Sequence, residues 1–66
     1  MDWHRIESDW TRFQHAAKRR WDRLGAQQLN AIGGRRHLLA ARIRDAYGVS
    51  DAESERQVAA WQAELT

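Results

Sequence analysis

Apolar residues recur at steps of three and four along the first third of this chain, and this spacing constrains the fold more than any other feature. The positions are Trp3, Ile6, Trp10, Phe13, Ala17, Trp21 and Leu24. At about 100° per residue they fall within roughly 80° of one another on a helical wheel, as the buried face of an amphipathic helix does. The spacing therefore predicts one helix over residues 3–24. Ser8 offers an alternative N-cap, which would leave Trp3 and Ile6 on an ordered arm.

Glycine residues divide the remainder of the chain into shorter helical segments. Gly25 ends the first segment, and a second helix over residues 26–32 stops at the glycine pair 33–34, where glycine can adopt the left-handed conformation. A third helix over residues 35–47 ends before Gly48 for the same reason. No segment alternates polar and apolar residues with the period of two that is typical of strands.

The clearest local signal is the tetrapeptide Ser50-Asp51-Ala52-Glu53, which has the form of a capping box. In that motif Ser50 bonds forward to a backbone amide, and Glu53 reaches back to the amide of the cap residue. A fourth helix is expected from there to residue 65. The sequence thus predicts an all-α fold, a single compact domain of about four short helices over residues 1–66. The predicted core comprises Trp10, Phe13, Trp21, Leu24, Leu29, Ile32, Leu39, Ile43, Tyr47, Val58 and Trp61.

Composition restricts how such a domain can be stabilised. The chain has 66 residues, and a domain of this size buries only about 60% of the surface that its unfolded chain exposes. It contains no cysteine, which excludes disulfides, a thiolate nucleophile and Cys-ligated zinc. No apolar run approaches the roughly 18 residues of a membrane span, and the first residues lack the apolar stretch of a signal peptide. We therefore expect a cytoplasmic protein whose core holds through packing or through a partner.

Basic residues are concentrated in the middle of the chain. Residues 12–44 hold nine basic side chains against one acid, a local charge of +8, whereas the two flanks together carry eight acids against two arginines, a charge of −6. On the predicted first helix Arg5, Arg12, Arg19 and Arg23 cluster within about 40°, on the side away from the tryptophans. The pattern predicts an exposed basic stripe.

Arg35 and Arg36 add to this basic surface at the start of the predicted third helix, where the helix dipole disfavours cations by about 0.3–1 kcal/mol each. Three interpretations remain open: a solvated surface that is paired internally with acids, a nucleic-acid contact, or a contact with an anionic membrane surface or an acidic protein. Arginine suits bidentate contacts to phosphate or carboxylate. The candidate binding surface consists of Arg12, Arg19, Arg23, Arg35 and Arg36.

No catalytic or metal-binding constellation is recognisable. His4 and His15 share a face of the predicted first helix but lie about 16 Å apart along its axis, too far to share a metal, and His37 falls on another helix. Ser50 is explained by its capping role. We expect no catalytic residue, no cofactor and no metal.

A longer series of residues spans nearly the whole chain: Ile6-Glu7, Trp10, Trp21-x-x-Leu24, Leu29-x-x-Ile32-x-Gly34-x-Arg36, Leu39, Ile43, Tyr47-Gly48-x-Ser50, Glu53, Gln57-Val58 and Trp61. This series resembles the CsbD-like family of small bacterial stress-response proteins. The resemblance implies a compact helical fold and induction during general stress, and it supplies no catalytic residues. The family often has a Thr and an acidic run where this chain has residues 25–28, so the middle of this chain is more basic than the family pattern.

Two functions follow as hypotheses. The first is a non-enzymatic stress-response protein that acts through protein contacts or self-association. The alternative is a weak, sequence-independent nucleic-acid-binding module that uses the basic residues. An exposed Trp3 would support either, because its ring could stack on a base or seed a dimer.

Overall fold

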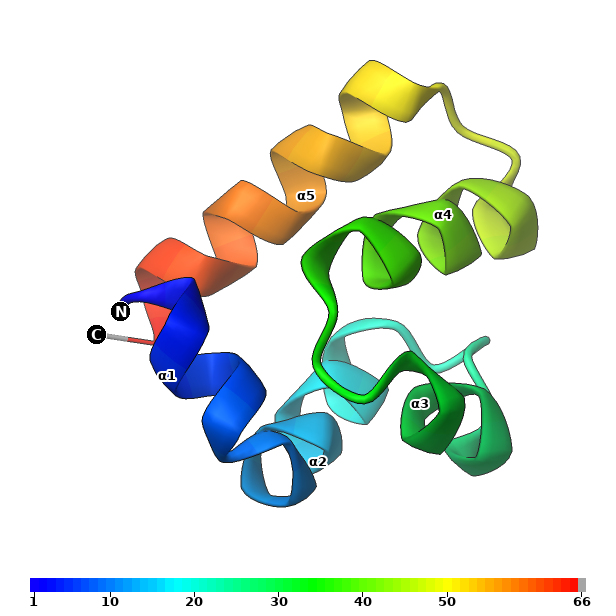
Figure 1. Cartoon of the computed structure of the whole chain (residues 1–66). Coiled ribbons are helices and arrows are strands. Elements are labelled where there is room, and N and C mark those ends of the chain that lie inside the picture. The colour runs from blue at the N-terminus through cyan, green and yellow to red at the C-terminus, as the bar shows by residue number, and fades with distance from the viewer. Residues whose placement is uncertain (66) are drawn as a thin grey trace.

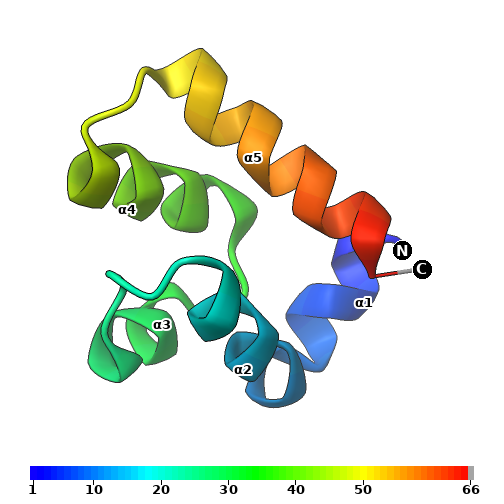
Figure 2. The same cartoon turned by 180° about the vertical axis from the view of Figure 1, so that it is seen from behind.

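The computed structural model describes residues 1–65, and over these residues the chain forms helices and no strand, which confirms the all-α prediction. The helices are α1 (Trp3–Ser8), α2 (Trp10–Arg20), α3 (Ala26–Ile32), α4 (Arg36–Tyr47) and α5 (Asp51–Glu64). They surround one interior, with α4 and α5 packed as a helical hairpin and α3 packed between α2 and α4 (Figures 1 and 2). The chain returns on itself, so α1 lies beside the last turns of α5 (Figure 1).

The prediction of one continuous helix over residues 3–24 is wrong, because the chain breaks at Asp9. Asp9 has φ −114° and ψ 32°, and its amide bonds the Arg5 carbonyl at 3.1 Å to close α1. Ser8 does not cap a helix here. Its hydroxyl donates to the His4 carbonyl at 2.8 Å, a local bond that competes with the backbone ladder and bends helices. The apolar period continues through the break because both helices pack on the same core.

The second difference is that α2 ends at Arg20, four residues before the predicted end. Trp21 follows with φ −127° and ψ 78°, which is not helical. The Lys18 ammonium donates to the carbonyls of Asp22 and Leu24 at 2.8 and 2.9 Å, so it satisfies backbone groups of the turn that replaces the last helical turn. Trp21 and Leu24 still reach the interior, but as part of a turn.

Two glycines end helices as predicted, but Gly25 does not end the first segment, because α2 stops at Arg20 and Gly25 is the N-cap residue of α3. Gly33 and Gly48 have φ of 60° and 66° and end α3 and α4, and Gly34 has φ of 82°. Gly34 is buried against α1, where a Cβ atom would lie 2.8 Å from the Cα of Glu7. The Trp3 indole donates to the Gly34 carbonyl at 2.8 Å. The corner between α3 and α4 therefore holds α1 in place.

The capping box of the last helix is only half formed. The Ser50 hydroxyl accepts the Glu53 amide at 3.1 Å, as the sequence predicts. The Glu53 carboxylate does not reach back to Ser50, because it bonds Gln57 and Arg56 farther along the helix. The corresponding bond from a side chain in the first turn to the cap amide is found instead at the start of α3, where the Gly25 amide donates to the Gln28 side chain at 3.0 Å.

The interior is filled by apolar side chains from all five helices and from the turn after α2. Of the residues expected in the core, Phe13 and Tyr47 are half-buried at its edge and the others are buried. Ile6, Ala17 and Ala40 are buried as well. None of the helices within residues 1–65 has the length and apolar character needed to cross a bilayer.

Candidate functional site

Three of the four tryptophans gather around the fourth, Trp61 of α5. The centroid of the Trp61 ring lies 6.0 Å from that of Trp3, 6.4 Å from Trp10 and 5.4 Å from Trp21, and each pair meets edge to face. This geometry places the positive edge of one ring against the negative face of another and adds about 0.5–1.5 kcal/mol per pair beyond burial. The cluster joins α1, α2 and the following turn to α5.

The indole N–H groups of these three partners are also bonded within the fold. Trp10 donates to the carbonyl of Leu29 in α3 at 2.8 Å, and Trp21 donates to the Gln57 side chain at 2.9 Å. Trp3, which the sequence left as an exposed candidate for stacking, is half-buried and bonded to Gly34. Within residues 1–65 no large apolar side chain is exposed. The aromatic rings are therefore used for packing.

Two of the five candidate arginines are occupied by contacts inside the protein. Arg36 is half-buried, with its guanidinium 3.2 Å from the Gln62 side chain, 3.6 Å from the Glu55 carboxylate and 5.6 Å from the centre of the Trp3 ring. Arg23 is not on α2, because that helix has already ended, and its guanidinium lies 5.2 Å from the centre of the Tyr47 ring. The predicted stripe therefore does not continue to Arg23.

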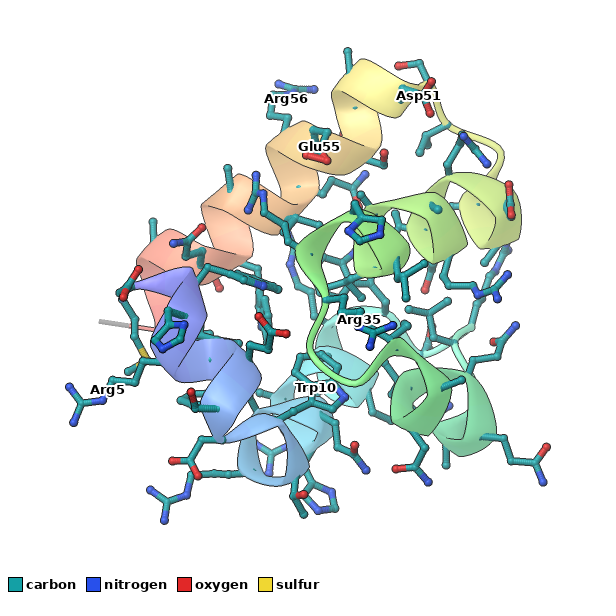
Figure 3. All side chains as sticks on the ribbon, in the orientation of Figure 1. Arg5, Trp10, Arg35, Asp51, Glu55 and Arg56 are labelled. Carbon is teal, nitrogen blue, oxygen red and sulfur yellow. The ribbon has the colours of Figure 1, made fainter. Side chains whose placement is uncertain are left out.

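The other three candidates, Arg12, Arg19 and Arg35, are exposed, and their side chains make no hydrogen bond, ion pair or ring contact among residues 1–65. Arg12 and Arg19 are seven residues apart on α2, which places them on one face about 10 Å apart. No acidic residue occurs in α2. Arg35 is on the linker before α4 (Figure 3). The free cations of the candidate surface are thus concentrated on α2.

A shallow groove lies beside this helix, between its last turns and the C-terminal end of α5. Its volume is about 340 Å³. Trp61 and Leu65 contribute apolar surface from the α5 side, and Arg19 and Arg20 contribute cations from the α2 side. The Arg20 guanidinium lies 5.7 Å from the centre of the Trp21 ring. The residues that line the groove are Ala16, Arg19, Arg20, Trp61, Glu64 and Leu65.

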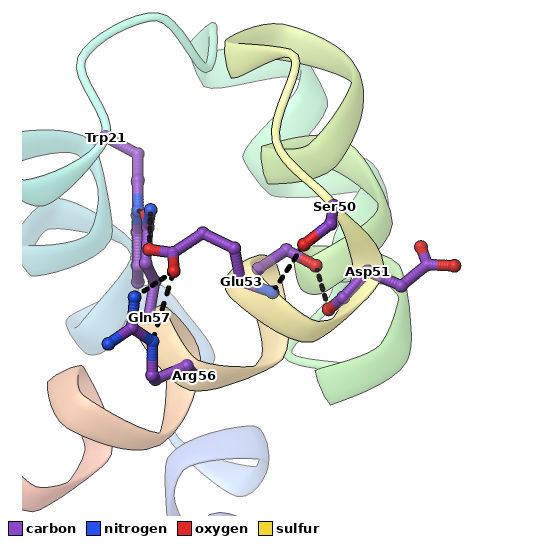
Figure 4. Close-up of polar contacts among 7 residues, drawn as sticks. Trp21, Ser50, Asp51, Glu53, Arg56 and Gln57 are labelled. Carbon is purple, nitrogen blue, oxygen red and sulfur yellow. Dashed lines mark hydrogen bonds and ion pairs between the residues drawn. The ribbon is translucent and has the colours of Figure 1, made fainter.

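A chain of polar contacts fixes the first turns of α5 (Figure 4). Trp21 donates to Gln57, Gln57 donates to the Glu53 carboxylate at 2.9 Å, and Arg56 donates to the same carboxylate. The bond from Arg56, followed by that from Gln57, lowers the pKa of the Glu53 carboxyl below its ordinary value. At the same end of α5, hydrogen bonds to Asp51 and then to Asp45 raise the pKa of Arg44. These contacts support the Trp21 side of the core.

The lowered pKa of Glu53 predicts a loss of stability in acid. A carboxyl whose pKa is depressed by folding stabilises the protein above its unfolded pKa, near 4.3, and this contribution is lost as the pH falls through the lower folded value. The midpoint of urea unfolding should therefore fall between pH 6 and pH 3, and the fall should be smaller in Glu53→Gln. Glu64→Gln, at an exposed carboxyl without a partner among residues 1–65, is the control and should keep the full pH dependence.

A second hollow, of about 140 Å³, lies between α4 and the first turns of α5 and includes His37 and Ser54 in its lining. Its charged groups are already paired: Arg44 contacts Asp51 at 2.9 Å, and Glu55 contacts Arg36. The Ser54 hydroxyl donates to the Asp51 carbonyl at 2.9 Å. No group of three His, Cys, Asp or Glu residues within positions 1–65 is placed to hold a metal ion. The groove beside α2 is thus the better candidate site.

Known bacterial proteins are similar to this chain over most of its length. A UPF0337 protein of Rhodopseudomonas palustris is 33% identical over 61 residues, which are 92% of this chain and 92% of the relative. One of Pectobacterium atrosepticum is 31% identical over 62 residues, 94% of this chain and 90% of the relative. The UPF0337 protein YjbJ of Escherichia coli is 28% identical over 54 residues, 82% and 78% of the two chains. No protein-family model matches the sequence, and no solved structure matches it significantly.

Proposed function

The chain belongs to the UPF0337 family, the CsbD-like proteins, and we propose that it is a non-enzymatic bacterial stress-response protein that acts by contacting other proteins. The resemblance to CsbD-like proteins motivates the stress role. The names of the relatives state a family and no activity. The molecular part of the proposal therefore depends on the surface of this chain.

The observation that carries the proposal is the contrast between α2 and the α4–α5 hairpin. On the hairpin, three of the four arginines contact an acid of the same chain, namely Arg36, Arg44 and Arg56, whereas Arg42 is exposed and pairs with no acid among residues 1–65. On α2, Arg12 and Arg19 have no such partner among residues 1–65, and Arg19 borders a groove with apolar walls. Arginine beside apolar surface is typical of protein interfaces, where charge and burial act together.

Nucleic-acid binding is the alternative function, and the absence of acids from α2 favours it. Phosphate contacts by Arg12 and Arg19 would give weak, salt-dependent and sequence-independent binding. Single-strand binders of this type add aromatic rings on which bases stack. Within residues 1–65 the large aromatic side chains are buried or half-buried, so such a platform is lacking. Because free arginines are present but exposed aromatic rings are not, we rank the protein-contact proposal above nucleic-acid binding.

Site-specific crosslinking in bacterial cells separates the two functions. A photo-reactive amino acid replaces His15, which is exposed on α2 between Arg12 and Arg19, and, as a control, Ala59 on the exposed side of α5. We expect stress-dependent adducts from position 15 that protease removes and nuclease does not, and fewer adducts from position 59. Changing Arg12 and Arg19 to alanine in the same chain should reduce them.

The outcomes of this experiment are distinct. Adducts that nuclease removes would replace the protein-contact proposal with the alternative. Equal adducts from both positions would overturn both proposals, because neither surface would then be selective. The same gels report the amount of the protein, and an amount that does not change between unstressed cells and cells under salt, heat or starvation would overturn the stress-response role.

A further inference from the structure

We propose that the groove between α2 and the end of α5 binds an acidic protein segment that inserts one apolar side chain against Trp61. This inference rests on the proposed function and adds the chemistry of the partner. The segment would carry carboxylates next to its apolar residue. Arg19 and Arg20 would bind the carboxylates, and Ala16, Trp61 and Leu65 would surround the apolar side chain.

The size and walls of the groove fit one anchoring side chain. Its volume of about 340 Å³ is at the lower end of the range for sites that enclose small ligands, about 300–1,000 Å³. The groove is open to solvent, so an extended segment can lie across it while one side chain enters. Trp61 is 3% exposed and is held by three other rings, so the floor is rigid and already formed. A preformed floor lowers the entropic cost of binding.

The charges at the rim specify an acidic partner and its orientation. Arg19 is exposed and without a partner among residues 1–65, and Arg12 lies two turns away on the same face. Arginine binds carboxylates through two parallel hydrogen bonds. Glu64 lies on the opposite wall and would repel carboxylates. The acidic groups of the partner are therefore expected over α2, with the apolar side chain directed toward α5.

Two other occupants fit less well. A nucleic acid would meet Glu64 at the groove and would find few unpaired cations there, whereas sequence-independent binding requires several neutralised phosphates. A second copy of this chain could offer the acidic start of α5, but Asp51, Glu53 and Glu55 are already paired with arginines of their own chain. An acidic segment of a different protein also meets Glu64, but it needs only the cations of Arg19 and Arg20 and can direct its apolar side chain, rather than a carboxylate, toward the Glu64 side.

The test is a titration of the isotopically labelled full chain with short peptides, followed by NMR at low salt. The probe is the capped peptide Asp-Glu-Phe-Glu-Asp, with controls in which alanine replaces Phe or lysines replace the acids. We expect shifts of the Ala16 and Leu65 amides and of the Trp61 indole with the first peptide. The alanine peptide should bind several-fold more weakly, and the lysine peptide should not bind.

Three variants test the groove: one is expected to weaken binding of the acidic peptide, one to strengthen it, and one, the control, to leave it unchanged. Arg19→Ala should weaken binding of the acidic peptide a few-fold, the range for a solvent-exposed ion pair. Glu64→Gln should strengthen binding several-fold, because it removes a repulsive charge from the groove. Arg42→Ala, at an exposed arginine of α4 outside the groove, should leave binding unchanged. All three side chains are exposed and without partners among residues 1–65, so circular dichroism should show intact folds.

Failure of this inference can be told from failure of the proposed function. If the alanine peptide binds as tightly as the Phe peptide, or if Glu64→Gln has no effect, the groove is not the site of the apolar anchor and the inference is wrong. If protein adducts still form from position 15 in cells, the protein-contact proposal stands without it. Tighter binding of a generic oligonucleotide at the same amides would overturn the inference and favour the nucleic-acid alternative.

Discussion

Replacing Trp61 with alanine is expected to leave most of the chain unfolded at 25 °C. Removing a buried Trp side chain costs about 3–5 kcal/mol, and the loss of three edge-to-face ring contacts places Trp61 at the upper end of this range. At about 0.05–0.15 kcal/mol per residue, a chain of 66 residues has a free energy of unfolding of roughly 3–10 kcal/mol. The loss is therefore comparable to the whole stability, because Trp61 is the common partner of Trp3, Trp10 and Trp21.

Circular dichroism at 222 nm and urea unfolding measure this effect. Trp61→Phe retains an aromatic ring in the same place and should remain folded with a lower midpoint. Trp3→Ala, at a half-buried ring with one such contact, should cost less than Trp61→Ala. A Trp61→Ala protein with native helicity and a cooperative transition near that of the wild type would show that the cluster is not the centre of the core.

Gly34→Ala should destabilise the protein much more than Gly48→Ala, although both glycines adopt positive φ. A left-handed conformation costs an alanine about 1–2 kcal/mol, and both variants share that cost. At Gly34 the new Cβ would also lie 2.8 Å from the Cα of Glu7, so backbone must move. Overpacking of this kind adds about 1–3 kcal/mol. The Gly48 site has nothing within 4 Å of the new atom.

The two glycine variants are compared by urea unfolding under identical conditions. The difference between their free energies of unfolding isolates the clash, because the conformational cost is common to both. Movement of Gly34 should also disturb the hydrogen bond from the Trp3 indole, so the signal of that indole N–H should shift in the Gly34→Ala spectrum. An equal decrease in the free energy of unfolding of the two variants would mean that α1 does not pack closely against the corner between α3 and α4.

The apolar spacing over residues 3–24 identified which residues face the core, but it did not show that the helix breaks at Asp9. Ile6, Trp10, Ala17, Trp21 and Leu24 are all buried, although they belong to two helices and a turn. A bend that keeps the same face on the core leaves the period intact, and the residue at the bend is neither glycine nor proline. By contrast, the helix ends at glycines 33 and 48 were predictable, because positive φ there requires that residue type.

The candidate surface was less predictable because it depends on contacts between distant segments. Whether Arg12 or Arg36 is free is decided by the presence of an acid nearby in space, and Glu55 is nineteen positions away from Arg36. The groove combines Ala16 and Arg20 of α2 with Glu64 of α5, and no spacing within either helix indicates that they meet. Sequence reasoning therefore selected the basic region and missed these groove residues. The four tryptophans could have indicated that the protein has a rigid aromatic cluster, but not that this cluster forms the floor of a groove or where that groove lies.

Because the chain breaks at Asp9, α1 is not stabilised as part of a longer helix. An isolated helix of six residues is too short to be stable in water, because the free energy needed to form its first turn exceeds the free energy gained by its few further hydrogen bonds. It is held by the burial of Ile6, the bond from Trp3 to Gly34 and the bond from the Gln62 side chain to the Met1 carbonyl at 2.8 Å. Each of these contacts reaches a different part of the chain. The helicity of α1 is therefore conditional, and this segment is ordered only while the α3–α4 corner and the end of α5 are both assembled.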